Sequence, residues 1–380
     1  MSEFSITYRY EAYFTTEVFA PGNELLCRAL QAGGLTAPVR VFFVVEKELL
    51  QFYPELPAAI EGYCRAHASA MKQAAAPLLQ AGGEACKDIG VSLQLCEAFL
   101  AARLCRQSCV IIVGGGALLD AAGFAAAIFH RGLRQLRIPT TALSQCDSGV
   151  GVKNGVNYLG KKNLLGCFAP PLAVINDAAF LRTLPPEMVS AAAAEAVKVA
   201  MIKDSDFFAW LTAQAPAIMA GDLAALATLV RRSAEIHQQH IVTGGDPFEY
   251  GSARPLDFGH WSAHKMEMLS EQRLSHGVAV GMGMLIDCRY AVLMGILAKD
   301  AYTALRALLR AFALPFDGAV LELRDAGGRR LVMAGLEEFR EHLGGQLHIT
   351  LPTAIGAKIE VTSIDDARMN EAMDLVLRDE

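Results

Sequence analysis

The first half of the chain alternates four short β-rich runs with Ala-rich stretches of helical length. Continuous apolar strands that alternate with helices are typical of a parallel sheet covered by helices on both faces. The sequence therefore predicts an α/β fold for this half. The runs are RVFFVV near 40–45, CVIIV near 109–113, RQLRI near 134–138 and LAVIN near 172–176.

The character of the chain changes after Pro185-Pro186. The segments near 187–203, 222–241, 276–297 and 299–313 are rich in Ala, Leu and Met and have helical periodicity. Pro186 suits the first turn of a helix. We therefore predict an α/β domain over 1–185 and a mostly helical domain over 186–380, with a short helix and one strand pair in its last 50 residues.

Composition excludes several classes of protein. The chain has 380 residues, of which 53% are hydrophobic and 19% charged, so it can bury a core and is not disordered. Its 34 Lys and Arg against 40 Asp and Glu give a net charge of −6 without a basic run, so nucleic acid is not an expected partner. Residues 110–129 have the length of a membrane span, but three consecutive glycines and Asp120 indicate a buried strand and helix instead.

The cysteines and the N-terminus predict the cellular compartment. The nine cysteines are an odd number, form no CxxC pair and lie in apolar stretches, which is typical of reduced core thiols. The N-terminus lacks a charged region followed by an apolar one, so no secretory signal is expected. We therefore predict a cytoplasmic protein that has no membrane partner.

Two glycine turns are candidates for ligand binding. Gly114-Gly115-Gly116 follows the strand CVIIV and opens a helix with Asp120 in its first turn. Backbone N–H groups at such a turn suit a dinucleotide pyrophosphate, but a simple tight turn explains the glycines equally well, because the spacing is not GxGxxG. The second turn, Gly82 to Lys87, places Glu84 and Lys87 three residues apart, and a capped surface helix is the favoured interpretation.

Polar residues gather between Pro139 and Pro170, in a segment that also holds glycines and small residues. A core segment would not carry such a set, and an ordinary exposed loop would carry more Glu or Arg. Lys and Asn side chains that converge suit phosphate and sugar hydroxyls, so we favour a phosphorylated polyol-like ligand over a solvated loop. The residues are Thr140, Thr141, Asp147, Lys153, Asn157, Lys161, Lys162 and Asn163.

The helical half offers metal ligands. Glu195 and Lys198 face the same side of an Ala-rich helix, where a buried carboxylate needs a partner. His260 and His264 are four residues apart, and His276 follows. Two histidines and one carboxylate describe a catalytic Zn²⁺ site. The alternative is a hydrogen-bonded histidine pair, and the spacing does not decide whether His264 or His276 is the second ligand.

From about Glu84 to His276 the chain resembles the sugar phosphate cyclases, whose founding member is dehydroquinate synthase. The family has a Rossmann-like N-terminal NAD-binding α/β domain, a helical C-terminal metal domain, and a closed cleft between them. The resemblance implies NAD and Zn²⁺ (or Co²⁺) as cofactors, a phosphorylated sugar substrate and a homodimer. It rests on GGEACK, GGGALLDAAGFAAAIFHRG, PTTALSQCDSGVGVKNGVN, GKKNLLGCF, DAAFLRTLPPEM, AEAVK, DFGHWSAHKME and HGVAVGMG.

The resemblance also implies roles for individual residues. The metal ligands of the family match Glu195, His260 and His276. Residues that hold the substrate match Asp147, Lys153, Lys162, Asn163, Lys198 and His264, and Arg131 matches an arginine that reaches the phosphate of the neighbouring subunit. Asp257 is expected to bind substrate hydroxyls, although the family has a different residue there. Residues that hold the cofactor match Glu84, Lys87, Gly115, Gly116, Asp120, Thr140, Thr141 and Thr183, with Glu46 as the acid for the adenosine ribose.

The chain departs from dehydroquinate synthase at three points. Asp257 replaces the Asn that lies three residues before the metal-binding His260. Position 253, where the family has an arginine, is Ala, and Arg254 is displaced by one residue. The C-terminal phosphate-binding lysine of the family has only Lys358 as a weak counterpart.

RPLDFGHW and GLEEFREHLGGQLHITL instead resemble the branch that cyclises sedoheptulose 7-phosphate to C7 cyclitols such as 2-epi-5-epi-valiolone, and the nearby Ebo-cluster cyclases. The resemblance therefore predicts a phosphate-eliminating lyase that closes a ring through transient oxidation, β-elimination, re-reduction, ring opening and aldol addition. 3-Dehydroquinate synthase is the alternative within the family, and a metal-dependent NAD polyol dehydrogenase is the alternative of another class.

Overall fold

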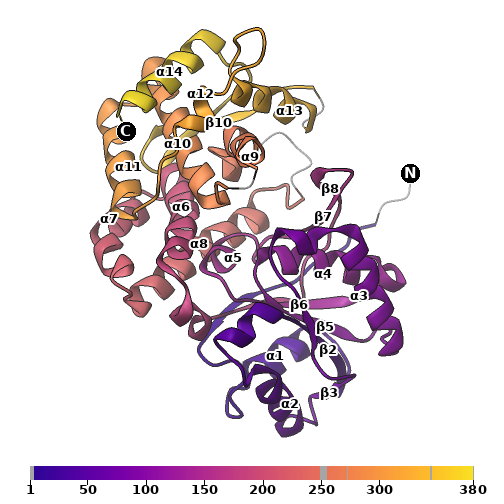
Figure 1. Cartoon of the computed structure of the whole chain (residues 1–380). Coiled ribbons are helices and arrows are strands. Elements are labelled where there is room, and N and C mark those ends of the chain that lie inside the picture. The colour runs from indigo at the N-terminus through magenta and orange to yellow at the C-terminus, as the bar shows by residue number, and fades with distance from the viewer. Residues whose placement is uncertain (1–3, 249–254, 272, 343–344, 380) are drawn as a thin grey trace. The chain divides into compact units, whose positions relative to one another are not determined.

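The computed structural model of the chain describes residues 4–248, 255–271, 273–342 and 345–379 (Figure 1). The chain forms two compact units. The first comprises Met1–Leu184 and His237–Val242, and the second comprises Pro185–Ile236 and Thr243–Glu380. Ala253 and Arg254 lie outside the described residues. Within the described residues, no helix is long and apolar enough to cross a membrane.

A parallel sheet forms the centre of the first unit. In the part of the chain that the structure describes it has seven strands in the order β1-β9-β6-β5-β2-β3, and β4 also pairs with β2. Every pairing in this sheet is parallel, as the sequence predicts. The strands are β1 Ala12–Thr15, β2 Val39–Glu46, β3 Met71–Gln73, β4 Leu78–Gln80, β5 Cys109–Gly114, β6 Arg134–Pro139 and β9 Ala173–Asp177.

Helices cover both faces of this sheet because its central strands are apolar on both sides. Phe43 and Val45 of β2 pack with α1 and α2, whereas their neighbours Phe42 and Val44 pack in a separate core with α3 and α4 (Figure 1). The helices of the unit are α1 Leu25–Ala32, α2 Leu56–Ala66, α3 Ile89–Ala101, α4 Gly116–Ile128 and α5 Ala142–Cys146. The short 3-10 helices are η1 Lys47–Gln51, η2 Glu84–Lys87, η3 Phe129–Arg131 and η4 Ala178–Thr183.

The polar segment between Pro139 and Pro170 contains α5 and an antiparallel hairpin of β7 Lys153–Tyr158 and β8 Lys161–Phe168. The loop that leads into the hairpin is held by Arg137 of β6, whose side chain is fully buried. Its guanidinium donates to the carbonyls of Ser148, Gly149, Gly151 and Lys153 at 2.7–3.4 Å, and to Asn154 Oδ1 at 2.7 Å. One buried cation therefore fixes the backbone that carries several of the predicted ligand-binding residues.

The second unit is mostly helical, as predicted. Pro186 occupies the first turn of α6, and residues 189–202 of that helix are buried. Within the described residues the helices are α6 Pro186–Lys203, α7 Ser205–Met219, α8 Leu223–Thr243, α9 His260–Leu269, α10 His276–Leu293, α11 Lys299–Ala311, α12 Ala319–Glu322, α13 Ala334–His342 and α14 Asp366–Asp379. The 3-10 helices are η5 Pro255–Asp257 and η6 Leu331–Met333.

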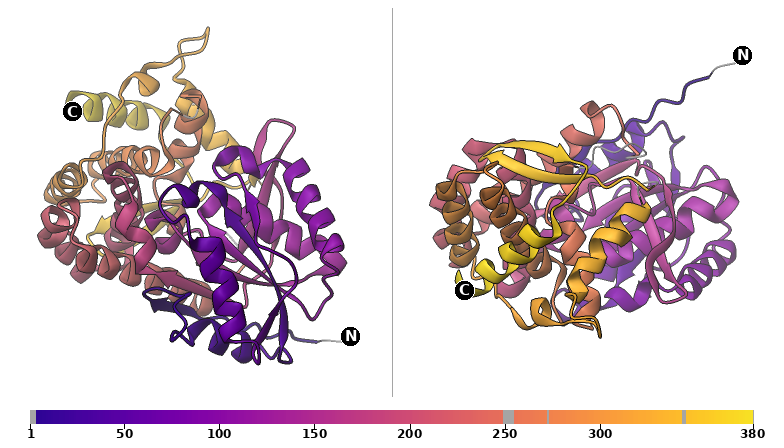
Figure 2. Two further views of the ribbon diagram at one scale, coloured as in Figure 1. Left: turned by 60° about the horizontal axis from the view of Figure 1, so that its bottom comes forward. Right: turned by 90° about the horizontal axis from the view of Figure 1, so that it is seen from above.

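A strand pair near the C-terminus completes the second unit. β10 Ile349–Ala354 and β11 Ala357–Val361 pair antiparallel, and Figure 2 shows them as two long arrows in the view from above. Residues 237–242, in the second half of α8, belong to the first unit, which the predicted division at residue 185 does not include. All nine cysteines are free thiols.

Arg137→Lys should destabilise the protein by about 3 kcal/mol, because an ammonium cannot satisfy the set of carbonyls that the guanidinium holds. Urea unfolding measures the change. The matched control is Arg134→Lys, an exposed position on the same strand, which should change the free energy of unfolding by less than about 0.5 kcal/mol. Equal effects of the two substitutions would contradict the role assigned to Arg137.

Candidate functional site

Three side chains of the second unit gather their acceptor atoms at one place. Glu195 Oε1 lies 3.3 Å from His276 Nε2 and 3.8 Å from His260 Nε2. One ligand atom from each residue lies within 4.8 Å of the other two, a separation that one cation can bridge. Glu195 is 1% and His260 7% exposed, so the centre is shielded from solvent. The structure therefore joins His276, with Glu195 and His260, in one cluster.

Glycines allow the helices that carry these ligands to come close together. A Cβ atom at Gly277, directly after His276, would overlap the backbone of Ala191, one turn before Glu195 on α6. Gly259 precedes His260 with φ +78°, and a Cβ there would lie 2.9 Å from the backbone nitrogen of Met284 on α10. These close contacts bring α9 and α6 against α10, and the three ligands come together as a result.

Hydrogen bonds fix the tautomers of both histidines. His260 Nδ1 lies 3.0 Å from the carbonyl oxygen of Phe258, and His276 Nδ1 lies 3.3 Å from Glu267 Oε2. A carbonyl and a carboxylate only accept, so each Nδ1 carries a hydrogen, and in the neutral ring each Nε2 turns a lone pair toward Glu195. Three acceptors that face each other without a donor repel, so the site requires a proton or a metal ion.

The pKa values of the two histidines differ in the metal-free protein. Burial lowers the pKa of His276, but its hydrogen bonds to Glu195 and Glu267 outweigh burial and raise it to about 10. Burial, together with the nearby Lys198 ammonium, lowers the pKa of His260 to about 4. The second proton of the His276 ring, on Nε2 toward Glu195, therefore occupies the place that a divalent cation would take.

Glu267 is a member of the site that the sequence interpretation did not include. It is 5% exposed, and with His264 and His276 it forms a second group whose ligand atoms lie within 4.8 Å of one another. His264 and Glu267 are three residues apart on α9, so both side chains face the same side of that helix. This His-x-x-Glu spacing was the available signal. His264 itself is exposed, whereas His260 is buried.

Lys198 is paired with the metal-site carboxylate. Its Nζ lies 2.5 Å from Glu195 Oε2, and its side chain is 2% exposed. The ion pair leaves the other oxygen, Oε1, directed toward the two histidines. A buried Lys in this position both neutralises Glu195 and orients it.

Asp287 anchors the start of α9 and was also absent from the sequence interpretation. Its carboxylate is fully buried on α10 and accepts from Gly259 N at 3.0 Å and from Trp261 Nε1 at 2.8 Å. These two donors flank His260 in the sequence. Asp287 therefore fixes the backbone before His260 and the indole side chain after it, although no spacing rule links residue 287 to residue 260.

In the first unit, the glycine turn after β5 lies against a carboxylate. Gly115 N donates to Glu46 Oε2 at 2.5 Å, and a Cβ at Gly114 would lie 2.7 Å from the same oxygen. A Cβ at Gly116 would lie 2.6 Å from Ser148 Oγ. The turn leads into α4, and the first N–H groups of a helix favour an anion, so the absence of side chains here leaves a backbone cradle.

A second polar group in this unit links the two predicted sets of ligand-binding residues. Lys87 is buried, its Nζ lies 2.7 Å from Asp120 Oδ2, and it also donates to Asn163 Oδ1. Asn157 bridges the same area, because it donates to Glu84 Oε1 at 2.7 Å and accepts from Asn163 N at 2.9 Å. The segment from Gly82 is thus one 3-10 turn with a buried lysine and not the surface helix that the sequence favoured.

The three predicted threonines have different surroundings. Thr140 is 2% exposed, and its Oγ1 has no hydrogen-bond partner among the described residues. Thr141 caps α5 through a reciprocal bond with Ser144, and Thr183 donates to the hydroxyl of Tyr53 at 3.3 Å. Only Thr140 therefore offers an unused buried hydroxyl, beside the glycine turn to which its N–H bonds through Gly114 O at 3.0 Å.

The remaining predicted residues are spread along the first unit. Asp147 Oδ1 lies 3.0 Å from His237 Nδ1, a partner that the sequence interpretation missed because it comes from α8. Lys153 begins β7 and pairs in register with Phe168, whereas Lys162 lies at the other end of the hairpin, next to the Tyr158–Lys161 pair. Both lysines are exposed, and so is Arg131 of η3, which has φ +66°.

Two further predicted residues, Asp257 and Lys358, lie in the second unit. Asp257 ends η5, three residues before His260, and is half-buried. Lys358, the weak candidate for the C-terminal phosphate ligand, lies on β11 with its Nζ 3.2 Å from Glu360 Oε1.

Comparison with known proteins identifies the class of protein that this fold and site define. The family model described as the 3-dehydroquinate synthase N-terminal domain matches residues 78–191, and the C-terminal model matches residues 192–326. The 3-dehydroquinate synthase of Xanthomonas axonopodis pv. citri is 36% identical over 304 residues, which are 78% of this chain and 80% of that protein. The enzyme of Halorhodospira halophila is 36% identical over 275 residues, 72% and 75% of the two chains. The chain belongs to the 3-dehydroquinate synthase family, within the sugar phosphate cyclase superfamily.

Solved structures share the fold at lower sequence identity. The 2-epi-5-epi-valiolone synthase of Streptomyces hygroscopicus, solved with NAD⁺ and Zn²⁺ bound, has a TM-score of 0.86 at 24% identity and covers all of both chains. A 2-deoxy-scyllo-inosose synthase complexed with carbaglucose-6-phosphate, NAD⁺ and Co²⁺ has a TM-score of 0.75 at 20% identity over 95% of each chain. The fold predicted from the sequence is therefore confirmed.

The buried Asp287 carboxylate should make stability fall as pH rises. Burial raises its pKa to about 7, although its bonds to Trp261 and Gly259 act in the opposite direction. Between about pH 4 and pH 7 the folded protein keeps a proton that the unfolded chain has lost, so rising pH favours unfolding through this group by up to about 4 kcal/mol. Asp287→Asn removes this contribution, and its free energy of unfolding should decline less across that range in pH-dependent urea unfolding.

The control is Asp300→Asn, an exposed carboxylate on α11, which should leave the pH slope unchanged. If Asp287→Asn and the unmodified protein have the same slope between pH 4 and 7, the raised pKa is wrong.

Proposed function

We propose that the chain is an NAD- and metal-dependent sugar phosphate cyclase that converts a phosphorylated ketose, with sedoheptulose 7-phosphate as the first candidate, to a carbocyclic cyclitol and inorganic phosphate. The observation that carries the proposal is the buried convergence of Glu195 Oε1 with the Nε2 atoms of His260 and His276. Such a set with one acidic and two imidazole ligands leaves coordination positions for a substrate.

The cofactor residues fit the groups that the proposal requires. The backbone cradle at Gly115 and Gly116 suits a pyrophosphate, and the Thr140 hydroxyl is a buried donor without another partner. Glu46 is proposed to hold the adenosine ribose, for which it would exchange its bond to Gly115 N for ribose hydroxyls. The other proposed cofactor residues are Glu84, Lys87, Asp120, Thr141 and Thr183.

Bound NAD would supply reversible hydride transfer, and Zn²⁺ or Co²⁺ at the three ligands would supply Lewis-acid polarisation of a substrate oxygen. The protein's own residues then bind and orient. Lys198 pairs with Glu195 Oε2 and leaves Oε1 directed toward the two histidines, and Glu267 holds the proton on His276 Nδ1. These contacts set the ligand geometry before substrate arrives.

The remaining polar residues are proposed to bind the substrate. Lys153, Lys162, Asn163 and His264 would hold the phosphate, and Asp147, Asp257 and Lys198 would bind hydroxyl groups. Phosphate can take up the proton of the adjacent C–H during elimination, so firm phosphate binding matters more than a strong general base. In the proposed homodimer, Arg131 would contribute to the phosphate site of the second subunit.

The charge of Asp257 supports a substrate without a carboxylate. A half-buried acid close in sequence to the metal ligand His260 adds negative charge to the site, where the dehydroquinate synthases have a neutral Asn. An anionic carboxylate on the substrate would be repelled there, whereas a neutral sugar backbone would not. The full-length similarity to 2-epi-5-epi-valiolone synthase supports the same choice.

3-Dehydroquinate synthase is the second candidate function. It is favoured by the curated relatives that are 36% identical to this chain and carry that name. A polyol dehydrogenase is a candidate of another class, because an NADH-dependent butanol dehydrogenase of Thermotoga maritima shares the fold with a TM-score of 0.64 at 13% identity over 99% of this chain and 98% of that one.

The metal assignment predicts that Glu195→Ala, His260→Ala and His276→Ala each abolish turnover and release the metal, because two ligands cannot hold it. Glu267→Gln should keep the ligands but weaken metal binding about tenfold or more, since an amide no longer fixes the His276 tautomer as strongly. Metal analysis after dialysis and competition with a chelator measure both effects. His348→Ala, a half-buried histidine of the same unit, is the control. Full metal content in all three ligand variants would refute the assignment.

The substrate assignment predicts phosphate release from sedoheptulose 7-phosphate with catalytic NAD and no net NADH. The parallel assay uses the carboxylate-bearing seven-carbon precursor of 3-dehydroquinate, and NMR identifies the products. Asp257→Asn should raise the relative kcat/KM for the carboxylate substrate by about tenfold, because it removes the repulsive charge. Faster turnover of the carboxylate substrate by the unmodified protein would select 3-dehydroquinate synthase, and net NADH formation would select the dehydrogenase.

A further inference from the structure

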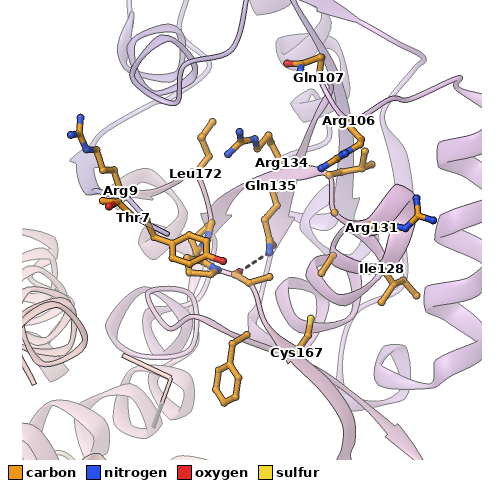
Figure 3. Close-up of a pocket in the computed structure, with 18 residues that line it drawn as sticks. Thr7, Arg9, Arg106, Gln107, Ile128, Arg131, Arg134, Gln135, Cys167 and Leu172 are labelled. Atoms are coloured by element: carbon orange, nitrogen blue, oxygen red, sulfur yellow. Dashed lines mark hydrogen bonds between the residues drawn. The ribbon is translucent and has the colours of Figure 1, made fainter. Parts of the chain in front are cut away.

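A cationic cavity lies at the amino-terminal edge of the sheet in the first unit. Its volume is about 760 Å³, and it is lined by the residues that lead into β1, β5, β6 and β9 (Figure 3). The glycine turn and Glu46 lie at the carboxyl ends of β5 and β2. Since β6 runs from Arg134 to Pro139, the two edges are roughly 17 Å apart, so this cavity is separate from the proposed cofactor site.

The charge of the lining has one sign. Four arginines, Arg9, Arg106, Arg131 and Arg134, line the cavity, and no Asp or Glu does. Within the described residues, none of the four is joined to an acid by an ion pair. In a chain with a net charge of −6, unpaired arginines gathered at one cavity create a local positive potential that attracts anions.

Two of the arginines are positioned to act together. Figure 3 shows the guanidinium groups of Arg106 and Arg134 on either side of Gln135, whereas Arg131 points away from the middle of the cavity. Arg134 begins β6 and Arg106 precedes β5, and these strands pair through Arg134 and Cys109. Both residues therefore lie at the amino-terminal ends of neighbouring, paired strands. Apolar side chains, Ile128, Leu133 and Leu172, form part of the wall.

We propose that this arginine pocket binds a small polyanion, an organic molecule with two or more phosphate or carboxylate groups, through Arg106 and Arg134. The planar guanidinium forms paired hydrogen bonds with both kinds of oxyanion, and the apolar wall accommodates the carbon skeleton of the ligand. Of the residues that line the cavity, Arg131 is also assigned to the substrate phosphate of the second subunit, whereas Arg106 and Arg134 have no role in the proposed reaction. The proposal rests on these two arginines and therefore does not depend on that reaction.

Cys105 provides a local reporter. It is the exposed member of the nine cysteines, all of which lie in the described residues, and it precedes Arg106 in the chain. Hydrogen bonds from Gln107 N and the Ser108 hydroxyl lower its pKa, so its thiolate forms more readily than the thiols whose pKa is raised by burial. A trifluoromethyl label on Cys105 therefore reads events beside Arg106 by fluorine NMR.

The test titrates the labelled protein with inorganic tripolyphosphate and, in a parallel arm, with citrate. We expect a saturable change of the Cys105 resonance with at least one of the two probes. The probe that binds with the higher affinity identifies the preferred oxyanion, phosphate or carboxylate. The double variant Arg106→Gln/Arg134→Gln should bind about a hundredfold more weakly, since each charge-assisted pair contributes about tenfold. Arg28→Gln, an exposed arginine on α1, is the matched control and should bind like the unmodified protein.

Two outcomes would overturn the proposal. One is the absence of a saturable change with either probe. The other is equal affinity in the double variant and the control. Arg106 and Arg134 are exposed, so the double variant should have the same thermal unfolding midpoint as the unmodified protein. An unchanged midpoint shows that the loss of binding is not caused by a loss of fold.

Discussion

The contact on which the helical unit depends is the approach of three acceptor atoms, Glu195 Oε1, His260 Nε2 and His276 Nε2, in a buried place. Lone pairs that face each other repel, so surrounding residues must hold them there. Gly277 and Gly259 admit the close helix packing, and Lys198 balances the carboxylate. The unit therefore requires a proton or a divalent cation at this place, which couples metal binding to stability.

The α/β unit separates its polar groups between the two edges of one parallel sheet. The carboxyl edge carries the glycine turn, Glu46 and the unused hydroxyl of Thr140, where α/β proteins commonly bind ligands. The amino edge carries the four arginines of the cavity, which have no part in the glycine turn. Strand direction alone thus distinguishes two anion-attracting places on the same sheet, one built from backbone N–H groups and one from guanidinium groups.

Much of the fold was predictable because the apolar periodicity of strands and helices, and the Pro and Gly residues at their ends, are local features of the sequence. The four apolar runs became β2, β5, β6 and β9, and Pro186 begins α6 as expected. The hairpin of β7 and β8 was harder to see, because its pattern is polar and it is held by the fully buried Arg137 from another strand. Glu267 had a local signal in its spacing from His264, whereas Asp287 and His237 reach their partners only through tertiary packing. The roles of the predicted site residues stay predictions.

Overall identity is a poor guide to the substrate of such a chain. A fold can carry different substrate specificities, so a relative at 36% identity over most of both chains shows the family and not the sugar that is used. Discrimination between substrates resides in the few groups that meet their differing substituents. A carboxylate substituent is a full charge, and a single acid in place of a neutral amide changes its binding free energy more than many apolar differences do. Asp257, three residues before a metal ligand, is therefore more informative about the substrate than the percentage of identical residues.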